Sequence, residues 1–167
     1  MSWRMLGSML VLCLAATVAA QKKEGGVEFL SKDVLKAYSA KLKAKEPSDL
    51  GGKRTKAAIE QVGDRGNYTY AVLRRDETGE PEVHANWADI FVVEEGSGSV
   101  LTGGQVKGGR EISQGERRGG EIVAGTRQKI AAGDKLIIPA GIPHQVLVAP
   151  GSFVTYLVIK IRKPTDQ

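Results

Sequence analysis

A short stretch near the carboxyl end, residues 133–144, constrains the fold of this chain more than any other segment. Residues 136–138 have the apolar, β-branched composition of a short buried strand. Pro139 ends that strand because proline donates no hydrogen bond to a neighbouring strand, and Gly141 permits a turn that other residues resist. A second proline restricts the backbone just before His144, where strand composition resumes. The stretch therefore predicts two short strands joined by a rigid corner that presents an imidazole.

The spacing of this stretch resembles the second sequence motif of the cupin family. That motif reads Gly, five residues, Pro, one residue, Gly, two residues, His, and every position is matched here by Gly133, Pro139, Gly141 and His144. The family's motif continues to an asparagine where this chain has Val148. The resemblance implies a jelly-roll β-barrel with His144 on its inner face.

The first cupin motif, which reads His-x-His, a short gap, Glu, six residues and Gly, is matched less well upstream. His84 takes the place of the first histidine, and Asn86 stands where the second is expected. Asp89 replaces the glutamate after a gap that is one residue shorter, and Gly96 follows six residues later. The leading glycine is displaced, to Gly79. Together the two motifs cover residues 83–148.

The resemblance implies that four side chains share the interior of the barrel as candidate metal ligands: His84, Asn86, Asp89 and His144. Two imidazoles and one carboxylate are the ligand set of the facial triad, which suits Fe²⁺ or Mn²⁺, with Zn²⁺ as the alternative. Asn86 would add a weak neutral oxygen or stay behind the ligands. A divalent metal ion is the expected cofactor. The competing interpretation is an apolar, metal-free pocket in which both histidines are ordinary core residues.

Residues 1–20 have the pattern of a cleaved export signal. Arg4 supplies a positive amino-terminal region, residues 5–16 are apolar, and small residues at 18–20 suit a cleavage site before Gln21. A membrane span needs ~20 apolar residues, and the charged residues that follow Gln21 arrive too soon for one. We therefore expect a periplasmic or secreted protein without a membrane segment.

The amino-acid composition limits the classes of ligand and partner that this protein can bind. Cleavage would remove Cys13, the only cysteine, so the mature protein would form no disulfide and no thiolate metal site. The net charge is only +5, because the 24 lysines and arginines are interspersed with 19 acidic residues. No zinc-finger or RNP-like motif is present. No serine or lysine stands in a recognisable nucleophile setting. These features favour a small-molecule ligand and exclude a nucleic-acid partner.

The chain divides into residues 21–54, which predict a helix and a linker, and residues 55–163, which predict the barrel. Ser31 is a suitable N-cap for a helix within residues 25–45, and an apolar stripe follows it at Val34, Leu35, Tyr38 and Leu42. The opposite face is rich in lysine, which fits the solvated side of a helix packed on the barrel better than a membrane-surface helix.

From residue 55 onward, short strands alternate with glycine turns, which predicts an all-β sandwich or barrel. Expected elements are a hairpin of residues 57–62 and 68–74, a strand at 90–93 with 99–102 as its hairpin partner, and a last strand at 153–161. Tyr156 in that strand is either a core residue or a pocket hydroxyl. The glycine-rich segment 103–125 is either a mobile flap over the barrel mouth or a plain surface loop.

The sequence is compatible with two functions. One is a metal-dependent enzyme that acts on a small oxygenated molecule by oxidation, isomerisation or lyase chemistry, with the metal held by His84, Asp89 and His144. The other is a non-catalytic protein that binds a sugar or similar solute in a metal-free barrel. No acid–base group beside the metal can be identified from the sequence. Cupin barrels often pair through their sheets, so the resemblance also implies a homodimer.

Overall fold

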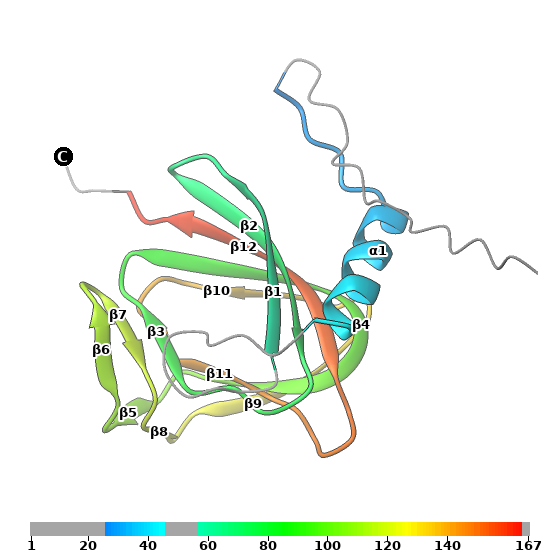
Figure 1. Cartoon of the computed structure of the whole chain (residues 1–167). Coiled ribbons are helices and arrows are strands. Elements are labelled where there is room, and N and C mark those ends of the chain that lie inside the picture. Colours follow the sequence, from blue (N-terminus) through cyan, green and yellow to red (C-terminus); the bar gives the residue numbers. More distant parts are fainter. Residues whose placement is uncertain (1–25, 46–56, 165–167) are drawn as a thin grey trace, which may run out of the picture.

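The computed structural model describes residues 26–45 and 57–164 (Figure 1). The expected signal peptide at residues 1–20, and most of the expected linker, lie outside the described residues. Within them the elements in chain order are α1 (Lys32–Lys43), β1 (Ala57–Asp64), β2 (Tyr68–Arg75), β3 (Glu82–His84), β4 (Trp87–Thr102), β5 (Gln105–Lys107), β6 (Arg110–Ser113), β7 (Glu116–Arg118), β8 (Glu121–Val123), β9 (Thr126–Ala131), β10 (Lys135–Ile138), β11 (His144–Leu147) and β12 (Val154–Arg162).

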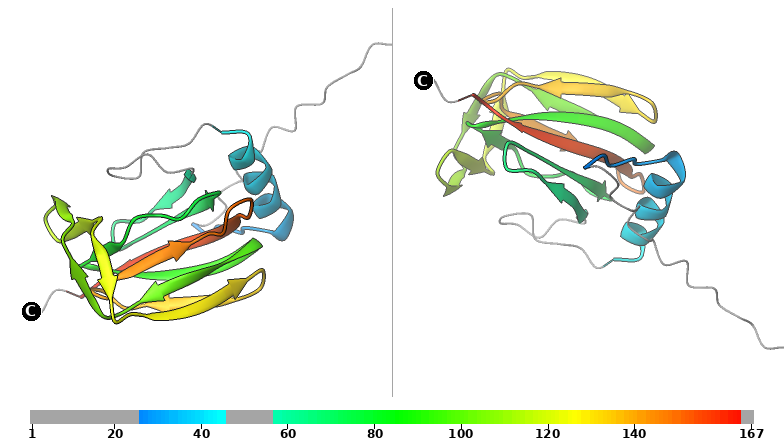
Figure 2. Two further views of the ribbon diagram at one scale, coloured as in Figure 1. Left: turned by 90° about the horizontal axis from the view of Figure 1, so that it is seen from below. Right: turned by 90° about the horizontal axis from the view of Figure 1, so that it is seen from above.

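The strands form two antiparallel layers that curl around one core (Figure 2). One layer has the order β1, β2, β12, β4 and β10, and the other has the order β9, β4, β11, β3, β7 and β6. The helix α1 lies outside the barrel, against β1 and β2. This is the expected all-β, cupin-type jelly-roll barrel with an amino-terminal helix, and that prediction is confirmed.

Strand β4 belongs to both layers. Its first half pairs with β10 and β12, and its second half pairs with β9 and β11. The change of partners falls just after Gly96, which has a φ of +75° and lies next to a register shift between Thr155 and Tyr156. The predicted hairpin between residues 90–93 and 99–102 is therefore wrong. The glycines between these segments permit a bulge in one continuous strand rather than a turn.

Two hydrophobic clusters lie on opposite faces of the first layer. The cluster inside the barrel includes Leu73, Phe91 and Tyr156, whereas the cluster beneath α1 includes Leu42 and Val72. Leu42 is 1% exposed, and burial of a leucine side chain contributes ~2–3 kcal/mol. The predicted helix is confirmed in its N-cap as well, because the Ser31 hydroxyl accepts a hydrogen bond from the backbone N–H of Val34. Among the described residues, no helix is both long and apolar enough to cross a membrane.

The glycine-rich segment 103–125 consists of paired short strands rather than a loop or a flap. Strands β6 and β7 form a hairpin that adds to β3, and β5 pairs with β8 beside it. Several of its glycines have a positive φ, and a side chain at Gly120 would come within 2.4 Å of the Lys107 carbonyl oxygen. Glycine is needed there so that the strands can turn within a few residues. The segment therefore extends the wall of the barrel next to β3.

The corner between β10 and β11 forms as predicted. Gly141 has a φ of +81°, and His144 is the first residue of β11. The N–H of Gly141 donates a hydrogen bond of 2.7 Å to the carbonyl oxygen of His84 at the end of β3. This contact fastens the corner to β3 and brings the two histidines of the chain together.

Candidate metal centre

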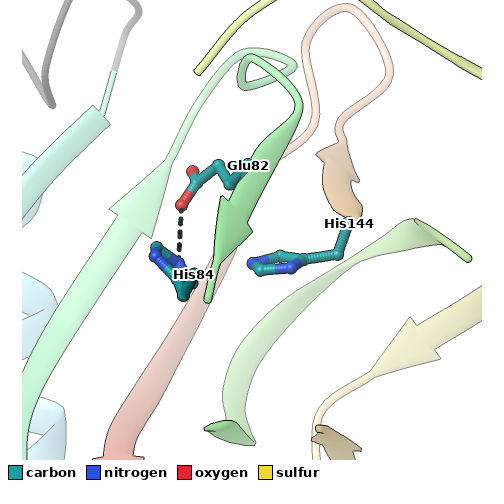
Figure 3. Close-up of side chains that lie close together, drawn as sticks. All are labelled: Glu82, His84 and His144. Carbon is teal, nitrogen blue, oxygen red and sulfur yellow. Dashed lines mark ion pairs between the residues drawn. The ribbon is translucent and has the colours of Figure 1, made fainter. Parts of the chain in front are cut away.

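The two imidazoles lie side by side in the barrel interior (Figure 3). Their ring centroids are 5.2 Å apart, and each histidine is 2% exposed. His84 ends β3 and His144 begins β11, two strands that pair with each other. The backbone therefore sets the separation of the two rings.

Each imidazole has its outer nitrogen held by an acceptor. The Nδ1 atom of His84 lies 2.5 Å from Oε2 of Glu116, and Nδ1 of His144 lies 3.1 Å from the carbonyl oxygen of Ile142. From these contacts we assign the single proton that each ring carries in its neutral form, the form that binds a metal, to Nδ1. The lone pair of each ring is then on Nε2, which faces the interior. Outer acceptors of this kind orient histidines that bind metals.

Two carboxylates lie beside the Nε2 atoms. Oδ2 of Asp89 is 3.4 Å from Nε2 of His84 and 3.5 Å from Nε2 of His144. Oε2 of Glu82 is 3.5 Å from Nε2 of His84, the contact that is dashed in Figure 3. Donor atoms bound at ~2.1 Å to an octahedral ion lie ~3 Å apart when adjacent and ~4.2 Å apart when opposite. The observed spacings fit this range.

One donor atom at the site lacks a partner. Nε2 of His144 is buried and has no hydrogen-bond partner among the described residues. A buried polar atom without a partner costs ~1–3 kcal/mol, which makes such atoms uncommon. Two imidazoles with two carboxylates form a donor set that a divalent ion of intermediate hardness satisfies. The residues present therefore fit a bound metal ion.

A lysine on the strand next to Asp89 reaches the same atoms, because Lys160 pairs with Asp89 across β12 and β4. Nζ of Lys160, on β12, lies 2.7 Å from Oδ1 of Asp89 and 2.9 Å from Nε2 of His84. The second distance requires a proton between the two nitrogens, so Lys160 and His84 share one proton in the metal-free site. A metal ion bound by Nε2 of His84 would have to displace it.

The electrostatics of the cluster keep both carboxylates ionised. Burial alone would raise the pKa of Glu82, but its contact with His84 and the charges of Arg75 and Arg118 outweigh burial and hold that pKa well below its usual range. For Asp89 too, burial is outweighed by its close contacts with the two histidines and by the charge of Lys160, which lower its pKa. Burial would lower the pKa of His84, but its carboxylate neighbours raise it to about 9 despite Lys160.

The structure brings together three of the four side chains singled out in the sequence: His84, Asp89 and His144. Asn86 does not join them, because β3 ends at His84 and Asn86 lies in the exposed turn that follows. The alternation that would have put Asn86 on the same face stops there. Its carbonyl oxygen instead accepts a hydrogen bond of 2.8 Å from the N–H of Lys163.

Sequence reasoning missed Glu82, which lies two residues before His84 on the same strand. A signal for it existed in the spacing of the first motif. With Glu82 in the place of the first histidine and His84 in the place of the second, the gap to Asp89 gains two residues and is no longer too short. Gly96 still follows at the expected distance. This alignment of the first motif is shifted by two residues from the one that begins at His84.

Other residues at the site carried no readable signal. Glu116 and Arg118 come from β7, which pairs with β3 so that Glu116 lies opposite His84 and Arg118 opposite Glu82. Arg75 donates to Oε1 of Glu82 at 2.8 Å and to the hydroxyl of Tyr156 at 3.1 Å. Tyr156 is thus a buried hydroxyl that also lines the pocket. These contacts depend on which strands pair, and that pairing could not be predicted from the sequence alone.

A cavity of about 330 Å³ opens beside the cluster. One side of it is charged, and the other is formed by aliphatic and aromatic side chains. Its lining residues are Ile59, Leu73, Arg75, Glu82, Asp89, Phe91, Ile112, Arg118, His144, Val146, Tyr156, Val158 and Lys160. The candidate metal centre therefore faces a space that a small molecule can enter.

The two-layered barrel, the motif that ends at His144 and the inward pair of histidines together define a protein of the cupin fold. No family model matches the chain, and no curated protein matches its sequence.

Among solved structures, the chain is similar to the polyketide cyclase RemF from Streptomyces resistomycificus, with 17% identity, a TM-score of 0.47 and coverage of 72% of this chain and 73% of the other. It is also similar to KdgF from a Halomonas species, with 17% identity, a TM-score of 0.45 and coverage of 72% and 92%. A cupin-2 domain protein from Shewanella frigidimarina matches with 16% identity, a TM-score of 0.41 and coverage of 63% and 80%. These likenesses say nothing about activity.

Proposed function

We propose that this protein binds one divalent metal ion, Fe²⁺ or Mn²⁺ in preference to Zn²⁺, and acts as an enzyme on a small oxygenated molecule in the barrel. His84, Asp89 and His144 would hold the ion, with Glu82 as a further carboxylate ligand. The observation that carries the proposal is Nε2 of His144, a buried lone pair without a partner on a ring whose other nitrogen is held. Carboxylate-rich donor sets favour Fe²⁺ and Mn²⁺ over Zn²⁺.

The site also contains an acid–base group that the sequence did not identify. A bound metal ion supplies a Lewis acid that polarises a substrate oxygen. Lys160, whose Nζ lies 2.7 Å from Oδ1 of Asp89 and which lines the cavity, would hold a proton there after a metal ion takes its place at His84. This arrangement favours an enzyme over a protein that only binds its ligand.

The proposal is tested by the metal content and metal uptake of three forms of the untagged protein. We expect the parent to bind about one Mn²⁺ per chain in calorimetry and the His144→Ala variant to lose that binding. The matched control is Gln145→Ala on the same strand, because Gln145 donates to the carbonyl oxygen of Gly79 instead of facing the cluster. A parent that takes up no Mn²⁺, Fe²⁺ or Zn²⁺ would refute the proposal.

A second candidate function follows from Lys160. Its ammonium already neutralises Asp89 and contacts His84, so a metal-free barrel with Lys160 as its permanent cation is self-consistent. That barrel would bind a sugar or similar solute without chemistry. In the metal proposal, Lys160→Met removes a competitor and strengthens Mn²⁺ binding. In the second, neither the parent nor this variant binds Mn²⁺.

We also propose export to the periplasm or the medium, supported by the amino-terminal pattern alone, and a homodimer, supported by the resemblance alone. Expression of the full chain with intact-mass analysis of the exported product tests the first, with a mature terminus at Gln21 expected. Light scattering of the purified protein tests the second.

A further inference from the structure

We infer that the natural ligand of the metal-loaded barrel is a small carboxylate with a short apolar body, anchored by Arg118. This inference rests on the metal binding proposed above and names the class of substrate. Three features of the cavity support it: the balance of charge, the unpaired Nε–H of Arg118 and the apolar side chains of the opposite wall.

The first observation is the balance of charge. Among the described residues that line the cavity or contact its histidines, three are carboxylates and three are cations, listed together as Glu82, Asp89, Glu116, Arg75, Arg118 and Lys160. When both imidazoles are neutral, as they are once Nε2 of each binds a metal, these charges cancel. A divalent ion leaves an excess of two positive charges in a largely buried space, and uncompensated buried charge is costly. An anionic ligand removes that excess, whereas a neutral sugar does not.

The second observation locates the anion. Nε of Arg118 is buried and has no hydrogen-bond acceptor among the described residues. The terminal nitrogens of Arg118 are engaged, since Nη2 lies 3.4 Å from Oε2 of Glu82 and Nη1 lies 3.2 Å from the carbonyl oxygen of Arg117. Arg75 differs, because its Nε already donates to the hydroxyl of Tyr156. Arg118 thus keeps one charged N–H for an acceptor, and a carboxylate oxygen is the strongest acceptor for it.

The two atoms without partners belong to residues that line the same cavity, and their chemistry is complementary. Nε2 of His144 has a lone pair that can bind a cation, whereas Nε of Arg118 has a proton that it can donate to a hydrogen-bond acceptor. A metal ion together with a carboxylate satisfies both and restores neutrality.

The third observation concerns the rest of the ligand. The wall away from the charges is aliphatic and aromatic, formed by Ile59, Leu73, Phe91, Ile112, Val146 and Val158. Hydroxyl groups placed against such a wall would lose their hydrogen bonds with water without replacement. A short branched hydrocarbon body fits it, so inorganic anions and sugars are disfavoured.

The test uses 3-methylbutanoate and its neutral isostere 3-methylbutanamide, which have the same apolar body. Calorimetry first measures Mn²⁺ binding to the parent and then titrates each compound into the Mn²⁺-loaded protein. We expect the carboxylate to bind at least about tenfold more tightly than the amide, and sulfate, which lacks an apolar body, to bind more weakly than the carboxylate.

Variants then test the anchor. Arg118→Lys keeps the positive charge near Glu82 but removes Nε–H, so we expect about a tenfold loss of carboxylate affinity while Mn²⁺ affinity changes less than about threefold. The control is Arg117→Lys, because Arg117 is exposed, lies on the other face of β7 and donates to the carbonyl oxygen of Gly108. Neither affinity should change in it.

Equal binding of the amide and the carboxylate, or undiminished carboxylate binding by Arg118→Lys, would overturn the inference. If the parent binds Mn²⁺ but not the carboxylate, the inference fails and the metal proposal stands. If the parent binds no metal, both fail. The comparison of carboxylate with amide needs only the parent, so it decides even if Arg118→Lys does not fold.

Discussion

At the scale of single residues, the contact between Lys160 and His84 couples metal binding to pH. The pKa of His84 is raised to about 9, so at neutral pH the metal-free site holds a proton that a metal ion must displace. We expect Mn²⁺ affinity to rise with pH, by up to about tenfold per unit, and to level off as pH approaches 9. Titrations in two buffers of different ionisation enthalpy should reveal proton release. Heats that do not depend on the buffer would contradict it.

The same raised pKa makes the stability of the metal-free protein depend on pH. The folded pKa of His84 lies above its usual 6.5, so its contribution is complete below pH 6.5 and is lost as pH rises through about 9. That contribution is at most about 3 kcal/mol. Melting temperatures between pH 6 and 9.5 should fall in the parent and fall less in His84→Gln. Parallel curves for the two proteins would show that His84 does not cause the alkaline loss.

The two carboxylates make the stability of the folded protein fall at low pH, whereas His84 makes it fall at high pH. Hydrogen bonds and nearby cations lower the pKa of Glu82 and of Asp89 in the folded state, even though burial opposes this. Their stabilisation is therefore complete above the usual carboxylate range and is lost as pH falls below it. This loss marks the acid side of the same stability profile.

Lys160 contributes differently to stability and to metal binding. Its loss in Lys160→Met leaves Asp89, whose side chain is 3% exposed, without its ammonium partner. Breaking a buried pair in this way costs about 3–5 kcal/mol, less here because Lys160 is itself partly exposed. We expect a lower melting temperature in chelator and a higher Mn²⁺ affinity. Lys129→Met, on an exposed face of β9, should change neither. A variant that melts like the parent would show that Lys160 does not stabilise the cluster.

At the scale of elements, the continuity of β4 depends on Gly96. A side chain there would come within 2.2 Å of the Phe153 carbonyl oxygen, at a φ of +75° that other residues adopt only with strain. We expect Gly96→Val to destabilise the protein by about 2 kcal/mol or more in urea unfolding. Gly103→Ala isolates the backbone strain, because Gly103 has a φ of +73° but nothing within 4 Å of an added side chain. Equal losses in the two variants would rule out the clash with Phe153.

The elements also explain which parts of the site the sequence could predict. The corner before His144 was predictable, because proline and glycine fix the backbone locally. Glu116 and Arg118 were not, because they reach the site only through the pairing of β7 with β3. Lys160 lies near the end of an apolar strand, where a lysine would ordinarily be assigned to solvent. Local backbone chemistry can be read from one sequence, whereas contacts set by non-local strand pairing cannot.

At the scale of the whole molecule, the candidate site joins the two layers of the barrel. Its side chains come from β3, β4 and β11, and Lys160 comes from β12. A metal ion that binds only the folded state should therefore stabilise the whole domain, by about 4 kcal/mol at a concentration a thousand times its dissociation constant. For a chain of this size, 1 kcal/mol raises the melting temperature by roughly 4 °C. Melting in Mn²⁺ and in chelator measures this shift. No shift in the parent would indicate an empty site.

The hydrogen bond from Gly141 to the carbonyl oxygen of His84 has a kinetic consequence. It holds the corner against β3, so both rings keep their separation before any ion arrives. Ordering of the histidines is then completed during folding, and little of it remains for the binding step. The group that has to move is the Lys160 side chain, and side-chain rotation is far faster than rearrangement of strands. We expect metal uptake to proceed without a slow conformational phase.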